Sequence, residues 1–118
     1  MNDVMKITTY TPDYNGSIAI VYNETKELSQ YLNPAQLDRV GTLGEKFEEK
    51  WLEVQAGTDT AWVYKIGKAI DADARAEKMR QAGNTLVLKA NAAYLDRIAI
   101  LGAHVPNVAE GVILGNYQ

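Results

Sequence analysis

The stretch NTLVLKANAAYLDRIAILGA, residues 84 to 103, decides how the fold of this chain is predicted. It is apolar except at Asn84, Thr85, Lys89, Asn91, Asp96 and Arg97. At 100° per residue, the apolar side chains of a helix over 84–102 would point in nearly every direction. The stretch therefore predicts a helix that is buried all round, partly against another subunit. The alternative is that residues 84–89 form a strand followed by a shorter helix, because short apolar runs are ambiguous.

Two more long helices are predicted upstream of this stretch. Over 34–56, apolar residues recur at steps of three and four, at Leu37, Val40, Leu43, Phe47, Trp51 and Val54. Asn33 and Pro34 provide a helix cap and a proline at the first helical position. A second helix is predicted over 59–82, ended by Gly83. The very short connections require the three helices to lie antiparallel to their neighbours.

The remaining segments predict a few β elements and one short helix. Residues 1–22 read as a β-hairpin, because VMKITTY and SIAIVY flank a turn containing Pro12 and Asn15-Gly16. A short helix is predicted over 23–32. In the tail, 103–118, Pro106 breaks the pattern and GVILGNY predicts a strand that joins the hairpin. The predicted fold is α+β and mainly α, with antiparallel helices, three long and one short, in a single domain spanning 1–118.

Composition narrows the classes of function. The chain has 118 residues, 47% of them hydrophobic and 23% charged, with a net charge of −3. It has no basic stripe that would attract nucleic acid or anionic membrane. The lack of cysteine excludes disulfides, zinc fingers and thiol nucleophiles. No signal peptide or membrane span is recognised, so the expected location is the cytoplasm, or a virus particle assembled there.

Signatures of catalysis are missing from the sequence. There is a single histidine, His104, and there are two serines, neither in a Gly-x-Ser-x-Gly turn. Gly41 and Gly44 lack the strand and the Lys-Ser/Thr that a phosphate-binding loop requires. We therefore expect no enzyme activity, no metal and no cofactor.

One ridge of the predicted second helix carries charge. Asp73 and Glu77 are four residues apart and Arg80 continues the same line. A solvated helix face is the ordinary explanation of such a pattern. The alternative hypothesis is a polar pocket between the second and third helices, to which these side chains would converge: Asp73, Glu77, Arg80, Arg97 and His104.

The charges inside the apolar stretch favour an interface. Burying Asp96 or Arg97 without a partner would cost several kcal/mol, roughly, so each should be paired or reach a rim. An ion pair between subunits meets this requirement. The predicted interface residues are Tyr94, Asp96, Arg97, Ile98 and Leu101.

Together these features predict a non-enzymatic structural or assembly protein, such as a component of a virus particle. It would act through contacts with copies of itself or with another protein. Two alternatives stay open. One is an inhibitor or regulatory module whose acidic helices mask a basic surface, and the other is a small-ligand-binding domain that uses the polar pocket.

Overall fold

A computed structural model describes residues 6–8, 10–11, 13–56, 59–67, 71–93, 95, 97–102 and 105–115 of the chain. Its centre is a five-stranded mixed sheet in the order β1-β5-β2-β4-β3. The strands are β1 (Lys6–Thr8), β2 (Ile18–Tyr22), β3 (Trp51–Ala56), β4 (Asp59–Lys65) and β5 (Arg97–Gly102). β1, β5, β2 and β4 are parallel to one another, and β3 pairs antiparallel with β4.

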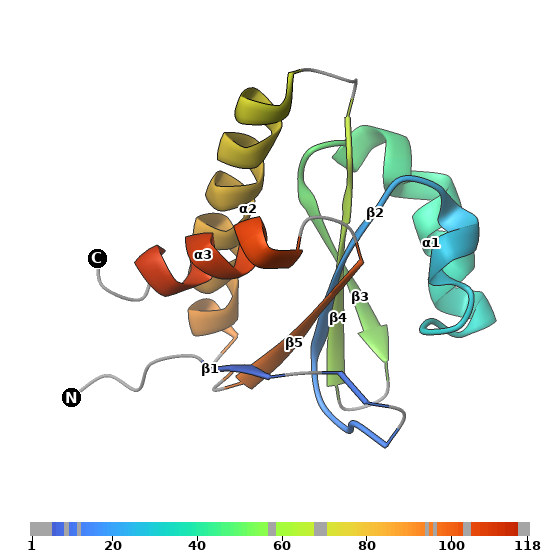
Figure 1. Ribbon diagram of the computed structural model, residues 1–118. Helices are drawn as coiled ribbons and strands as arrows, with labels where there is room; N and C mark the ends of the chain where they lie inside the picture. The colour runs from blue at the N-terminus through green and yellow to red at the C-terminus, as the bar shows by residue number, and fades with distance from the viewer. Residues whose placement is uncertain are drawn as a thin grey trace.

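Helices cover both faces of the sheet (Figure 1). On one face lie α2 (Ala72–Ala92) and α3 (Val105–Gly115). On the other lie α1 (Pro34–Leu43) and two short 3₁₀ helices, η1 (Thr25–Leu28) and η2 (Gly44–Phe47). Successive residues of β2 belong to the two halves of the core, one on each face of the sheet. Val21 packs on the α2 side and Ile20 on the α1 side. Strands buried on both faces are expected to be apolar throughout, as IAIVY is.

The prediction of a mainly α-helical fold with antiparallel long helices is wrong, because the structure centres on a mostly parallel sheet. The predicted hairpin over 1–22 is also replaced. Its two strands, β1 and β2, belong to the same sheet but are parallel, and β5 lies between them. A turn pattern predicts a local reversal, but it cannot show that a distant strand will insert.

Residues 51–56 and 59–65, predicted as parts of two helices, form the antiparallel β3–β4 pair. The helix α1 ends at Leu43 and η2 at Phe47. Beyond them the burial alternates, with Leu52 and Val54 buried and Glu53 exposed. Trp51 and Val54 are three residues apart, as on a helical stripe, but in β3 they point to opposite faces of the sheet and are buried there by different helices. The spacing alone predicts a helix, which explains the error. In β4 the run Ala61 to Tyr64 is buried throughout, as in a central strand.

The stretch 84–103 is divided between a helix and a strand. The helix α2 continues through Gly83, so residues 84–89 are helical, and β5 begins at Arg97. Within α2 a single stripe is buried, comprising Arg75, Met79, Ala82, Gly83, Leu86, Val87 and Ala90. The strand β5 supplies the remaining apolar residues, with Ile98 to Ile100 buried. The helix has a solvent-exposed side after all, and a partner subunit is not needed to bury it.

The tail, predicted to contain a strand, forms the helix α3. Its buried residues are Val108, Gly111 and Val112, which are spaced as on one side of a helix. The short helix predicted over 23–32 is reduced to η1. Among the described residues, no helix combines the length and apolar character needed to cross a membrane.

The crossing of α2 and α3 depends on two glycines. A Cβ on Gly83 would overlap the backbone oxygen of Val108, and one on Gly111 would overlap the backbone oxygen of Arg80. Gly83 is therefore placed inside a helix for packing and does not end it, although a helix interior normally disfavours glycine. Because the helices approach this closely, Val108 and Val112 are fully buried.

We expect Gly83→Ala to destabilise the protein. Alanine would gain up to about 1 kcal/mol of helix propensity, but the clash with α3 should cost roughly 1–3 kcal/mol or more. The free energy of unfolding in urea and the melting temperature measure the result. Gly41→Ala in α1 is the matched control, since no atom lies within 4 Å of its added Cβ. It should stabilise by about 0.5–1 kcal/mol, and equal effects of the two substitutions would contradict the packing role.

Candidate functional site

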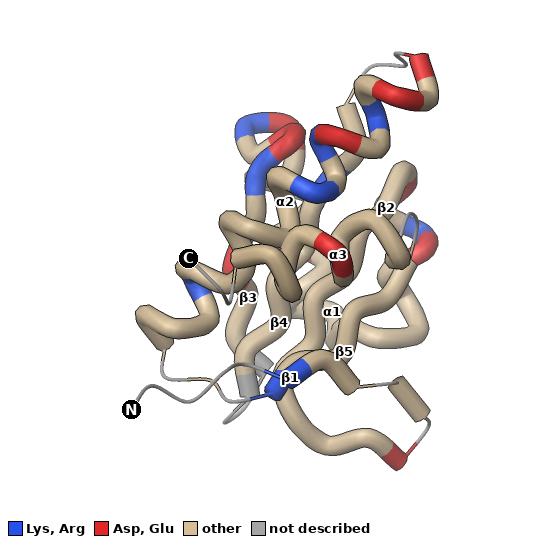
Figure 2. The backbone as a smooth tube through the Cα atoms, turned by 60° about the vertical axis from the view of Figure 1, so that its left-hand side comes forward, with Lys and Arg blue, Asp and Glu red and all other residues tan. Residues whose placement is uncertain are grey.

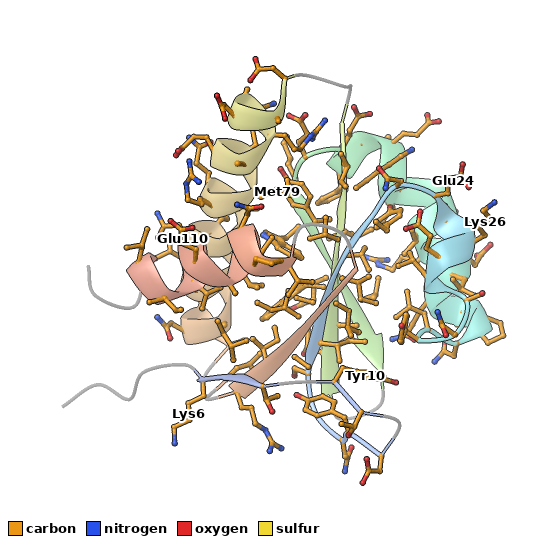
Figure 3. The ribbon with its side chains drawn as sticks, in the orientation of Figure 1. Lys6, Tyr10, Glu24, Lys26, Met79 and Glu110 are labelled. Carbon is orange, nitrogen blue, oxygen red and sulfur yellow. The ribbon has the colours of Figure 1, made fainter. Side chains whose placement is uncertain are left out.

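The helix α2 contributes one side to the core, and its two flanks line hollows on the surface. The side chain of Asp71 caps its start by accepting a hydrogen bond from the backbone N–H of Ala74 at 2.8 Å. One side of the helix packs on the sheet, and Met79 lies on that side (Figure 3). The two flanks of this buried stripe face different neighbours. One flank borders α3 and the other borders η2 and β3.

On the α3 flank lie three residues of the predicted polar pocket, Asp73, Glu77 and Arg80. Arg80 Nη2 donates to Glu77 Oε2 at 2.7 Å, and this hydrogen bond raises the pKa of the guanidinium, helped by the charge of Glu110. Glu77 is exposed and Arg80 is half-buried at the edge of a shallow groove of about 290 Å³. Figure 2 shows both signs of charge mixed along the first half of α2. The three residues share one helix face without an enclosed cavity.

The structure does not bring Arg97 to this group. Arg97 opens β5, which starts beside the C-terminal end of α2, whereas Asp73 lies in the first turn of that helix (Figure 1). The guanidinium carbon of Arg97 lies 5.6 Å from the ring centroid of Tyr14, and Nη2 donates to the backbone oxygen of Asn15 at 3.4 Å. His104, the fifth predicted residue, lies outside the described residues.

The predicted interface residues fall mostly inside the fold or outside its described part. Ile98 is fully buried in the core. Leu101 is half-buried and packs against the α1-side cluster. Arg97 is exposed, and Tyr94 and Asp96 are not among the described residues. Most of what this segment buries is thus buried by the chain itself.

A different set of apolar residues is exposed. Among the described residues, the large apolar side chains left more than half exposed are Leu88 (66%), Ile113 (52%) and Leu114 (53%). Leu114 borders the shallow groove together with Asn84, and Leu88 follows Asn84 by one helical turn. Ile113 precedes Leu114 on the outer side of α3. We call these three residues, with the neighbouring Glu77, Arg80 and Glu110, the α2–α3 face.

The other flank of α2 forms the larger hollow, a cleft of about 440 Å³. Its floor includes Trp51 and Tyr64, whose ring centroids are 5.2 Å apart. The indole N–H of Trp51 donates to the backbone oxygen of Ala82 at 2.8 Å, which ties β3 to α2. Lys50, Lys78 and Lys89 surround the opening. We call this hollow the lysine cleft.

Glu49 lies at the edge of the lysine cleft in an unusual backbone conformation. Its φ of 60° is in the left-handed region, which non-glycine residues rarely adopt. Its backbone N–H donates to the backbone oxygen of Lys65 at 2.9 Å, and its carboxylate pairs with Lys78. A Cβ on Gly67 would overlap that carboxylate. Gly67 thus leaves the space in which the ion pair forms.

Tyr64 and Arg75 contribute to the electrostatics around Glu49. Burial raises the pKa of Tyr64, the charge of Glu49 raises it further, and Arg75 opposes the change. Arg75 is only 9% exposed and donates from Nη2 to the backbone oxygen of Gly67 at 3.3 Å. At neutral pH the phenol of Tyr64 therefore stays protonated and can donate a hydrogen bond.

The lysine cleft was missed at the level of sequence. Lys78, Gln81, Thr85 and Lys89 are spaced at three and four residues, which would have shown a polar ridge on α2. The opposite wall comes from residues 47–51 and 64, which were predicted to be helical. Because β3 and β4 were not predicted, the positions of Trp51 and Tyr64 at the floor of the cleft could not be predicted either.

Comparisons with known proteins do not identify the chain. No family model matches it, and neither a curated protein nor a solved structure matches it. In the part of the chain that the structure describes, no three His, Cys, Asp or Glu residues gather as they would around a metal ion.

The two buried tyrosines should make the protein less stable in alkali. Burial raises the pKa of Tyr22 as well as that of Tyr64. Above about pH 10 the unfolded chain loses phenolic protons that the folded chain retains, so the free energy of unfolding falls as the pH rises. Absorbance at 295 nm should show at least two tyrosines, Tyr22 and Tyr64, that ionise late. Tyr22→Phe and Tyr64→Phe should each remove one, and unchanged titration curves would contradict the assignment.

Proposed function

We propose that this protein is a non-catalytic contact protein whose α2–α3 face docks onto a second copy of the chain. The observation that carries the proposal is the exposure of Leu88, Ile113 and Leu114 on two helices packed against each other. Scattered exposed apolar residues need no explanation, but exposed apolar residues on adjoining surfaces favour an interaction site. A partner surface would remove them from water.

The energetics favour a weak, concentration-dependent association. Fully burying a leucine or isoleucine gains about 1.5–3 kcal/mol, and these three side chains are already partly covered. Covering the rest gains roughly 3–5 kcal/mol in total by the same scale. Association costs at least about 4 kcal/mol in lost translation and rotation. Polar contacts around the three residues must therefore supply the rest of the free energy of association.

The charges of the α2–α3 face suit a second copy. Arg80 lies beside Glu77 and is also influenced by Glu110, so both signs lie next to the apolar residues. In a two-fold dimer the same surface meets itself, and each residue i contacts a residue j of the partner. A face with both signs can place Arg80 of one copy near Glu110 of the other.

The test is the mass in solution, measured by light scattering after size exclusion over a range of protein concentrations. We expect the mass to rise with concentration for the native chain. Ile113→Lys and Leu114→Lys should each shift the chain to the monomer, because a lysine at the contact would have to lose its hydration. Both side chains are half exposed, so the melting temperature should change little.

Gly41→Lys is the matched control, since it adds the same charge on α1, which covers the opposite face of the sheet (Figure 1). It should leave the association unchanged. A native chain that stays monomeric at every concentration would exclude self-association, and an equal loss with Gly41→Lys would show that net charge, and not the α2–α3 face, controls it.

A further inference from the structure

We propose that the lysine cleft binds a small anion that carries a flat ring, of about the size of a nucleoside monophosphate. The cleft lies on the flank of α2 away from α3, so the proposal does not depend on the α2–α3 contact. Its volume of about 440 Å³ is within the range of small-molecule sites.

The charge of the cleft favours an anion. Its lining contains three lysines and one carboxylate. The carboxylate, Glu49, is paired with Lys78. Among the described residues, no ion pair involves Lys50 or Lys89, and both are exposed beside the opening. An anion entering the cleft therefore meets two lysines whose charges are not already compensated there.

The floor of the cleft favours a flat, partly apolar group next to the anion. Phe47 is half-buried, and Trp51 and Tyr64, which line the cleft, are 3% and 5% exposed. Gln81 adds a side-chain amide that can bind polar atoms of a ring. The hydroxyl of Thr85 donates to the backbone oxygen of Gln81 at 3.1 Å, and its oxygen can still accept a hydrogen bond. Sites for small molecules commonly combine apolar walls with a few polar groups of this kind.

The backbone at Glu49 indicates that the rim has a defined shape. A non-glycine residue in the left-handed region costs on the order of 1 kcal/mol or more, and such residues concentrate at ligand sites. Here the conformation directs the Glu49 carboxylate to Lys78, in the space left by Gly67. The ion pair fixes the Lys78 ammonium at one wall of the cleft, so a ligand does not have to order it.

The position of the cleft in the sheet agrees with this assignment. Tyr64 is the penultimate residue of β4, so the floor lies near the carboxyl end of a parallel strand. In open α/β sheets, ligands bind outside the carboxyl ends of the strands. The lysine cleft flanks this edge on the side covered by α2.

The experiment is a titration of the full chain followed by ¹H–¹⁵N NMR, with the indole N–H of Trp51 as the reporter. The probes are adenosine 5′-monophosphate and indole-3-acetate, which place a phosphate or a carboxylate beside a flat ring. Adenosine supplies the ring alone and inorganic phosphate the anion alone. We expect a saturable shift with at least one of the two complete probes in the micromolar to millimolar range, and weaker binding of each part.

The double variant Lys50→Gln/Lys89→Gln should weaken binding by roughly fivefold, because each exposed charge contributes modestly, while Glu49 and Lys78 stay in place. The control is Lys26→Gln, which removes one charge beside Glu24 on the far side of the sheet from α2 (Figure 3). Its affinity should equal that of the native chain.

Three results would overturn the proposal. The first is no shift of the Trp51 signal by either complete probe at millimolar concentration. The second is equal weakening by Lys26→Gln, which would indicate a general charge effect. The third is unchanged binding by the double variant in a chain whose melting temperature is native.

Discussion

The burial of both faces of the parallel strands β5, β2 and β4 is the constraint on which the rest of this structure depends. Residues such as Val21 and Ile20 are adjacent in sequence and enter opposite halves of the core. A sheet with two apolar faces needs a layer on each, since it would otherwise expose apolar surface to water. The positions of α1 on one side, and of α2 and α3 on the other, follow from this requirement.

Part of this architecture was predictable from the sequence. The cap at Asn33 with Pro34 as the first helical residue and the strand character of 18–22 rest on local chemistry, whereas the predicted end of that helix at residue 56 was wrong, since α1 ends at Leu43. The order of the strands does not, because the position of β5 between β1 and β2 joins segments about 90 residues apart in sequence. Local patterns contain little information about such pairings.

The errors at 59–65 and 97–102 have one physical cause. In a central strand both faces are apolar, so the alternation that distinguishes strands from helices is lost. Ile98, Ala99 and Ile100 show this, being buried in succession. The prediction of site residues was limited in the same way, because it also relied on local patterns. Asp73, Glu77 and Arg80 lie together because they share one helix, whereas the structure places Arg97 beside Tyr14, and the lysine cleft was not predicted.

The edges of the sheet have a consequence of their own for aggregation. The edge strand β1 is three residues long, and its exposed Lys6 is in register with the exposed Arg97 of β5. At the opposite edge, the backbone oxygen of Gln55 in β3 accepts a hydrogen bond from the side chain of Gln36 at 2.7 Å. Short length, positive charge and side-chain covers are the devices that prevent strands of separate molecules from pairing. A sheet with such edges resists growth into fibres through strand pairing between molecules.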